Sequence, residues 1–252
     1  MPWEKATMPD RITSAGDGAD SAANTPESRI LSEVALFRGL PPEQLSKIEA
    51  RVRRRTLPAG AHVVTVEEPG ETVYVVLEGS VKVYVTRPDG TEVVLAALGR
   101  GELIGEMSLA DSLGRSANVI TLEETNFLLM DRGTFRASVE ELPTMALNLA
   151  NVLSRRLRLA NAHWRSVAAM DVPGRVAAQL LALAREYGEP SSRNGILIPL
   201  HLTQSDLAAL VGASRVRVNQ AIAFFKKRRY LSVGTDHRIT IHDADALARR
   251  AR

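Results

Sequence analysis

A change of hydrophobic period near Asp131 does most to restrict how this chain can fold. Between residues 56 and 130, short apolar runs are separated by turn residues, and Asp89-Gly90 stands between two strand-like runs as a hairpin turn does. Beyond Asp131 the apolar residues recur three and four apart, which is typical of helices. The sequence therefore predicts an α+β protein that begins with a β-roll and continues mainly as helices. The β-roll is expected to be a jelly roll, also called a double-stranded β-helix, of short strands.

A long helix is predicted to follow the β-roll. From about Glu140 to Ala169 the apolar residues form one narrow seam, at the length and period of a two-stranded coiled coil. This favours a dimerisation helix, and the alternative is a helix packed on its own domain. Pro173 ends the helix or forms a hinge to the next one. The seam residues are Leu142, Met145, Leu149, Val152, Leu153, Leu157, Ala160, Trp164 and Val167.

Four segments are predicted along the 252 residues. Residues 1–28 are rich in small and polar residues, and we expect them to form a disordered tail. The β-roll takes residues 29–139, the dimerisation helix residues 140–170, and a C-terminal domain residues 171–252.

Composition excludes several chemistries and marks the C-terminal domain as basic. The chain has no cysteine, which rules out disulfides, thiolate metal sites and cysteine nucleophiles. A signal peptide and an apolar run of roughly 20 residues are both missing, so we expect a cytoplasmic protein with no membrane segment. From residue 172 onward, 13 Lys and Arg residues face six Asp and Glu residues, whereas the rest of the chain has 19 against 23. This segregation indicates a polyanion as the partner of the C-terminal domain.

The C-terminal domain has the pattern of a winged helix-turn-helix. Thr203 is suited to cap a first helix, Gly212 to make the tight turn, and Ser214 to cap a second helix. Ala208 is small where the two helices would cross, and Val218 would pack back between them. Two short strands with a bend at residues 234–236 are predicted to follow and to form the wing.

Polar side chains near the start of the second helix suit the edges of DNA bases. Arginine pairs with guanine, and Asn and Gln pair with adenine, while basic residues further along suit phosphates. We therefore predict double-stranded DNA as the partner. The predicted DNA-binding residues are Thr203, Ser214, Arg215, Arg217, Asn219, Gln220, Lys226, Lys227 and the wing residue Arg238.

A second group of candidate binding residues lies near the end of the predicted β-roll. The segment Gly101–Leu109 is rich in glycine and contains Glu106, and Arg115-Ser116-Ala117 follows it. Backbone amides and a guanidinium can bind a phosphate, and a carboxylate can accept a hydrogen bond from a sugar hydroxyl. These residues are a logical site for a sugar–phosphate anion.

The order of these motifs resembles the CRP/FNR family of transcription regulators over roughly residues 30–252. Gly105–Ser108 with Arg115–Ala117 is similar to the phosphate-binding cassette of cyclic-nucleotide-binding domains, residues 171–175 to the family's hinge, and residues 210–215 to its recognition motif. The resemblance implies that Glu106 binds the ribose 2′-hydroxyl, Arg115 the cyclic phosphate, and Asn161 the base. It implies cyclic AMP as the effector, a homodimer on a pseudo-palindromic DNA site, and RNA polymerase as a further partner. The ligand-binding residues are then Gly105, Glu106, Met107, Arg115, Ser116, Ala117 and Asn161.

Departures from the family pattern leave alternatives open. Ala160 stands where family members that bind cyclic AMP often have a hydroxyl, so a cyclic dinucleotide remains an alternative effector. Haem, for which His163 is the one suggestive ligand, and ligand-independent DNA binding are the others. Val216 replaces the glutamate that is usual after the recognition arginine. We therefore do not predict that this protein recognises the DNA half-site typical of the family. The five histidines lack metal-ligand spacing and no nucleophile–base arrangement is evident, so we do not expect an enzyme.

Overall fold

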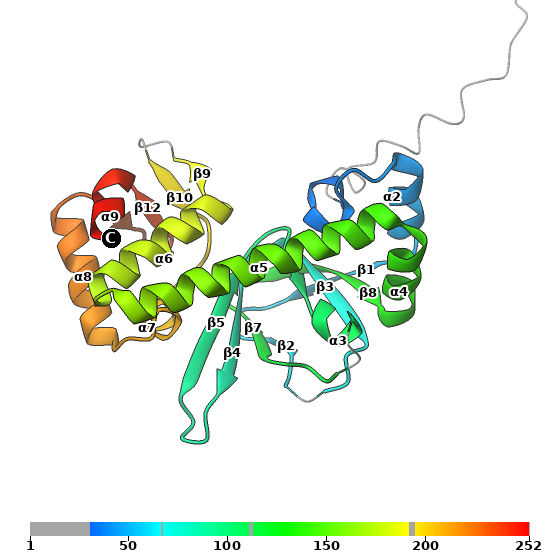
Figure 1. Ribbon diagram of the computed structural model, residues 1–252, viewed down its shortest axis with the longest axis horizontal. Coiled ribbons are helices and arrows are strands. Elements are labelled where there is room, and N and C mark those ends of the chain that lie inside the picture. Colours follow the sequence, from blue (N-terminus) through cyan, green and yellow to red (C-terminus); the bar gives the residue numbers. More distant parts are fainter. Residues whose placement is uncertain (1–30, 67, 111–112, 192–194, 252) are drawn as a thin grey trace, which may run out of the picture.

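The computed structural model describes residues 31–251 apart from residues 67, 111–112 and 192–194. The tail predicted for residues 1–28 lies outside the described residues. In Figure 1 the β-roll and the C-terminal domain occupy opposite ends of the molecule, and helix α5 (Pro143–Ala169) runs from one to the other.

Among the described residues, eight strands build the β-roll as two four-stranded sheets, and the predicted jelly roll is thereby confirmed. One sheet has the order β1-β8-β3-β6 and the other β2-β7-β4-β5. The predicted turn at Asp89-Gly90 joins β4 to β5, and Gly90 there has a φ of +81°, which glycine tolerates without strain. The strands are β1 (Arg53–Leu57), β2 (His62–Val64), β3 (Thr72–Glu78), β4 (Val81–Thr86), β5 (Glu92–Leu98), β6 (Leu103–Ile104), β7 (Asn118–Thr121) and β8 (Thr125–Asp131).

Strands β3 and β8 of the β1-β8-β3-β6 sheet have buried residues on both faces. Val76 and Phe127 point between the two sheets and form a core inside the roll. Their neighbours Val73 and Val75 point outward, because alternate residues of a strand face opposite sides. The outward residues pack against helices of the same domain, which are η2 (Ala35–Phe37), α2 (Pro42–Glu49), α4 (Arg132–Glu141) and the first half of α5.

The long helix begins later than the sequence suggested. We predicted one helix from about Glu140, but α4 ends at Glu141 and α5 begins at Pro143. Leu142 between them is extended, with φ −117° and ψ 92°. A residue that precedes proline is pushed out of the helical region, and proline itself fits the first position of a helix, so Pro143 accounts for the break.

The two halves of α5 have different surroundings. Met145, Leu149 and Val152 are buried against the β-roll of the same chain. Leu157 and Trp164, in the second half, are 63% and 72% exposed. The first half is thus a helix packed on its own domain, and the second half leaves apolar side chains uncovered.

The C-terminal domain has the predicted helices and wing. Helices α6 (Val172–Tyr187), α7 (Gln204–Val211) and α8 (Arg215–Lys227) pack with the wing strands β11 (Leu231–Val233) and β12 (Ile239–Ile241) around one core. The wing is part of a larger sheet than we predicted, with the order β11-β12-β10-β9, because β9 (Glu189–Pro190) and β10 (Ile196–Ile198) join it. Asp243 caps a final helix, α9 (Ala244–Arg250), that we had not predicted.

The C-terminal domain is packed closely on the β-roll. Ala97 of β5 is buried in the core of the C-terminal domain, and Leu210 of α7 is buried beside Tyr84 and Val94 of the β4–β5 hairpin. A side chain at Gly99 would come within 2.7 Å of Leu200, so glycine allows this close approach. Within the described residues, none of the helices is both long and apolar enough to span a membrane.

Candidate ligand-binding and DNA-binding sites

A sharp turn at Gly105 starts the predicted ligand-binding segment. Strand β6 ends at Ile104, Gly105 has a φ of +86°, and the short helix α3 (Glu106–Ala110) follows at once. A Cβ at Gly105 would overlap the guanidinium of Arg115. Glycine is therefore needed here twice, for its backbone conformation and for the space that it leaves to Arg115.

Arg115 is held inside this segment although its side chain is charged. It is only 7% exposed, and its Nη1 donates to the Gly105 carbonyl and to Ser108 Oγ, both at 2.9 Å. Its Nη2 donates to the Thr72 carbonyl at 2.6 Å. Burial lowers the pKa of Arg115, yet arginine stays protonated in proteins. These three oxygens are neutral, so the bonds orient the cation without cancelling its charge, which suits it to an anionic ligand.

Glu106 is 2% exposed and forms an ion pair with the long helix. Arg156 of α5 donates from Nη1 to Glu106 Oε1 at 2.6 Å and from Nη2 to Glu102 Oε2 at 3.0 Å. Burial alone raises the pKa of Glu102, but Arg156 and Arg155 outweigh it, so this pKa lies below its usual value. The acid predicted to bind the ribose is thus already bonded to α5.

A neighbouring arginine extends this network into the C-terminal domain. Arg155 donates from Nη2 to Glu102 Oε1 at 2.5 Å and from Nη1 to Glu186 of α6. Tyr187 lies beside the network, and burial raises its pKa. A continuous line of ion pairs therefore leads from Glu106 through the two arginines to α6. We name Glu106, Arg156, Glu102, Arg155 and Glu186 the ion-pair chain.

The remaining predicted ligand residues differ in their exposure. Met107 and Ser116 are exposed, while Ala117 is buried. Asn161 is exposed on α5, more than one turn beyond Arg156. The structure thus brings Gly105, Glu106 and Arg115 into one segment and leaves Asn161 on the uncovered half of α5.

The sequence reasoning missed Arg155 and Arg156. A signal for Arg156 was available, because Met145, Leu149, Val152 and Arg156 continue one ridge at helical spacing. A cation on a buried ridge needs acidic partners. Nothing in the spacing alone showed that these partners are Glu102 and Glu106.

The helix-turn-helix has the local geometry that its sequence indicated. Thr203 and Asp206 form a reciprocal capping box at the start of α7, in which Thr203 Oγ1 accepts from the Asp206 amide at 3.2 Å and Asp206 Oδ2 accepts from the Thr203 amide at 3.1 Å. Gly212 closes α7 in the left-handed conformation, with φ +63°. Ser214 caps α8 by accepting from the Arg217 amide. Ala208 and Val218 are buried between the helices as predicted.

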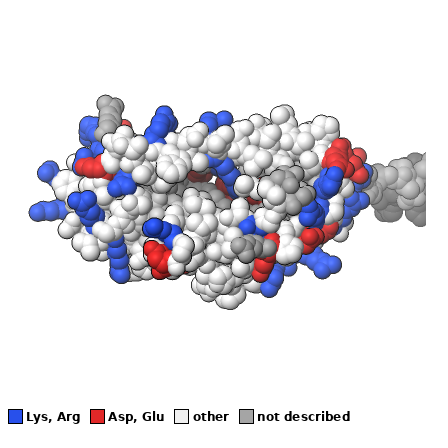
Figure 2. Space-filling view, turned by 60° about the horizontal axis from the view of Figure 1, so that its bottom comes forward, with Lys and Arg blue, Asp and Glu red and all other residues white. Residues whose placement is uncertain are grey.

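Most of the predicted DNA-binding residues are accessible together. Arg215, Arg217, Gln220, Lys226 and Lys227 are exposed on α8, and Asn219 is partly buried, with its Oδ1 buried and unbonded. Figure 2 shows Lys and Arg side chains that project from the end of the molecule formed by the C-terminal domain. This end presents a positive surface to a polyanion.

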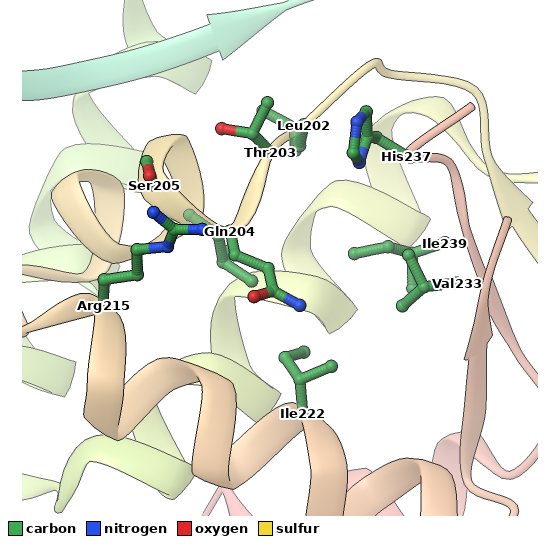
Figure 3. A pocket seen from close by; sticks show the side chains of 10 residues that line it. Leu202, Thr203, Gln204, Ser205, Arg215, Ile222, Val233, His237 and Ile239 are labelled. Carbon is green, nitrogen blue, oxygen red and sulfur yellow. The ribbon is translucent and has the colours of Figure 1, made fainter. Parts of the chain in front are cut away.

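A hollow of about 440 Å³ lies between α7, α8 and the wing. Figure 3 shows that Arg215 extends from the start of α8 toward the start of α7, where Gln204 and Ser205 lie. Backbone N–H groups at a helix start favour an anion. The hollow adds Gln204 and Ser205 to the predicted residues on this surface, and its floor is apolar. The lining residues are Leu202, Thr203, Gln204, Ser205, Leu207, Arg215, Ile222, Val233, His237 and Ile239.

Arg238 of the wing contacts the β-roll. It donates from Nη2 to Glu123 Oε2 at 2.6 Å and from Nε to the Pro199 carbonyl at 2.9 Å. We had predicted a phosphate contact for this residue, and in this arrangement its guanidinium is bonded inside the molecule.

The histidines form no metal site among the residues that the structure describes. His201 and His237 are neighbours, with ring centroids 5.1 Å apart in an edge-to-face arrangement. This is an aromatic contact between a loop and the wing.

Comparison with known proteins finds a matching domain family for each half of the chain. Residues 54–141 match the cyclic nucleotide-binding domain, and residues 174–250 match the Crp-like helix-turn-helix domain. The chain is 36% identical over 224 residues to the CRP-like cAMP-activated global transcriptional regulator of Mycobacterium tuberculosis, covering 88% of this chain and 99% of that one. It is 36% identical over 187 residues to the cyclic AMP receptor protein of Thermus thermophilus, covering 74% and 83%. The fold is similar to that of FixK2 from Bradyrhizobium japonicum, with a TM-score of 0.70 at 19% identity over 80% of this chain and 98% of that one. The chain belongs to the CRP/FNR family of transcription regulators.

Proposed function

We propose that this protein is a sequence-specific DNA-binding transcription regulator whose affinity for DNA is controlled by a cyclic nucleotide, and that the effector is cyclic AMP. The observation that carries this proposal is the presence, in one chain, of a buried Arg115–Glu106 cassette and an exposed basic recognition helix. Both relatives named above carry cyclic AMP in their names, and together with the matched domains they support the choice of effector.

The residues of the cassette fit a cyclic nucleotide. Arg115 is buried, positive and oriented by neutral oxygens, so it would pair with the cyclic phosphate. The turn at Gly105 and the hydroxyl of Ser116 would donate further hydrogen bonds, with Met107 and Ala117 beside them. Glu106 would accept from the ribose 2′-hydroxyl, and Asn161 would reach the base.

Competition for Glu106 gives a physical route from ligand to DNA. Glu106 is bonded to Arg156, and the ion-pair chain continues to Glu186 of α6. A ribose hydroxyl at Glu106 would change how strongly this acid holds Arg156. An arrangement of α5 and α6 in which Arg156 is bonded to Glu106 would then differ in ligand affinity from one in which this bond is broken. Only such a difference in affinity can shift the populations of the two arrangements.

DNA binding uses α8 in the major groove of a two-fold site. Arg215, Arg217, Asn219 and Gln220 would contact base edges, and Thr203, Ser214, Lys226, Lys227 and Arg238 would contact phosphates. Two chains would dimerise through the uncovered half of α5, where Leu157 and Trp164 are exposed. In the competent dimer the two copies of α8 would lie about 34 Å apart, one turn of a pseudo-palindromic site.

Further partners and boundaries follow from the same proposal. RNA polymerase would be the partner of the DNA-bound dimer, in the cytoplasm of a bacterial cell. We propose residues 29–139 as the ligand-binding domain, 140–170 as the dimerisation segment and 171–252 as the DNA-binding domain.

Calorimetric titration with cyclic AMP tests the effector, with cyclic GMP and cyclic di-GMP in parallel. We expect micromolar or tighter binding of cyclic AMP, and an increase in DNA affinity when the protein is saturated. Arg115→Lys keeps a positive charge near the site but loses the planar fork that holds Gly105 and Thr72, so it should lose most of the ligand affinity. Arg87→Lys, at the exposed hairpin turn, is the matched control. Tight binding of cyclic di-GMP alone would replace the proposed effector, and unchanged DNA affinity at saturation would refute the coupling.

A further inference from the structure

The exposed face of α8 begins with an apolar side chain. Successive residues of a helix are about 100° apart around its axis, so residues 216, 220, 223 and 227 form one ridge. The buried residues Val218, Ala221, Ile222 and Phe225 lie on the opposite side. The ridge begins with Val216, which is 66% exposed, followed by Gln220, Ala223 and Lys227.

Two arginines flank Val216 on the helix surface. Arg215 and Arg217 are each about 100° away from Val216, on opposite sides, and both are exposed. A recognition helix inserts its first residues most deeply between the two phosphate backbones. Val216 therefore lies between Arg215 and Arg217, which we expect to contact base edges, and its exposed side chain would face the bases beside them.

The chemistry of valine restricts what it can recognise there. Its side chain has no hydrogen-bonding group, so it cannot distinguish the donors and acceptors of base edges. The major groove contains one apolar group, the 5-methyl of thymine, and small apolar side chains contact it. Val216 is 66% exposed in the described structure, so burial against such a methyl would remove apolar surface from water.

We propose that Val216 is a specificity-determining residue that selects thymine through its 5-methyl group, at a base pair next to the one contacted by Arg215. This inference rests on the proposed function, because it assumes that α8 enters the major groove. It assigns to one side chain a preference for thymine over cytosine and over uracil.

Replacement of thymine by deoxyuridine tests the inference, because it removes the methyl group and leaves the pairing edge unchanged. A preferred site is first selected from a random DNA pool with the full-length, effector-saturated protein. Each thymine of one half-site is then replaced in turn by deoxyuridine, and the dissociation constant is measured. We expect one replacement to weaken binding about fourfold, the factor that corresponds to about 0.8 kcal/mol for one buried methyl or methylene group.

Val216→Ala links this effect to the side chain. The variant loses two methyl groups at an exposed helix position, where alanine favours the helix, so the fold should be retained. We expect Val216→Ala to bind the thymine and deoxyuridine sites equally, while Val93→Ala, at an exposed valine of β5, keeps the fourfold difference. As a gain of function, 5-methylcytosine at the same position should bind the unaltered protein better than cytosine does.

The outcomes separate this inference from the proposed function. A selected site whose thymines can all be replaced without loss, or a methyl dependence that Val216→Ala retains, overturns the role of Val216 and leaves sequence-specific binding intact. A pool that yields no preferred sequence overturns both.

Discussion

The wing residue Arg238 and Glu123 of the β-roll form an ion pair of 2.6 Å that joins the DNA-binding domain to the ligand-binding domain. Glu123 also accepts from Ser80 Oγ at 2.6 Å, so its carboxylate is fixed in place. Lys82 of β4 adds a second link, 3.4 Å from Asp206 of α7. The cation that we expect to bind a phosphate is therefore also a contact between the domains, and the two uses exclude each other.

Glu123→Gln should release Arg238 for DNA. We expect DNA affinity without effector to rise, because a free cation becomes available to a phosphate. The slope of log affinity against log salt should steepen by about 0.9 for each subunit. Fluorescence anisotropy over a range of salt concentrations measures both. In the background of Arg238→Gln, the same Glu123→Gln change should have no such effect, and an equal effect there would contradict the explanation.

Arg156→Met should destabilise the protein strongly. It leaves Glu106 buried without its cation and Glu102 paired with Arg155 alone, and breaking a buried ion pair from one side costs about 3–5 kcal/mol. Urea unfolding followed by circular dichroism measures the loss in the free energy of unfolding. Arg158→Met, at an exposed position two residues along the same helix, is the control and should stay within about 0.5 kcal/mol. Equal effects of the two substitutions would show that the ion-pair chain is not an element of stability.

Acid should weaken the fold through Glu102. Its pKa lies below the ordinary value of 4.5, so the folded protein binds its proton less readily than the unfolded chain does. The stabilisation is therefore complete above pH 4.5 and is lost as the pH falls through the lowered pKa. In urea unfolding between pH 7 and pH 3, Glu102→Gln should show a shallower loss of stability than the unaltered protein. Glu141→Gln, at the exposed end of α4, should follow the unaltered curve.

Trp164→Asp should weaken dimerisation. Trp164 is 72% exposed on the uncovered half of α5, and an aspartate there would place a charge in an apolar contact between two copies. Sedimentation velocity over a range of concentrations should show a monomer for the variant where the unaltered protein is a dimer. Arg165→Asp changes the neighbouring exposed residue and serves as the control. A Trp164→Asp variant that remains a dimer at the same concentrations would exclude this part of α5 as the dimer contact.

Local signals predicted the elements of this fold well. The Asp89-Gly90 hairpin, the capping residues Thr203 and Ser214, and the turn at Gly212 each depend on a few neighbouring residues, so the sequence alone indicates them. The fold class followed from the change of period. The break at Leu142 was also local, and the preference of the residue before proline was overlooked.

Contacts between distant segments could not be read in the same way. The ion-pair chain joins residues that are 31 to 54 positions apart, and helical spacing does not say which acids an arginine on α5 will meet. The pairing of Arg238 with Glu123 spans 115 positions. The spacing of apolar residues likewise could not show which half of α5 packs on its own chain. Apolar residues that face a partner chain and those that face a domain of the same chain recur at the same helical spacing.

The position of Ala97 has a consequence for hybrid regulators. Ala97 belongs to the β-roll by sequence, yet it completes the core of the C-terminal domain, and Gly99 admits Leu200 beside it. An exchange of effector specificity between relatives by splicing at the hinge near Asp171 would separate Ala97 and Gly99 from the side chains that they accommodate. The natural unit of exchange is therefore discontinuous in sequence. A graft of this C-terminal domain onto another sensor should carry the β4–β5 hairpin with it.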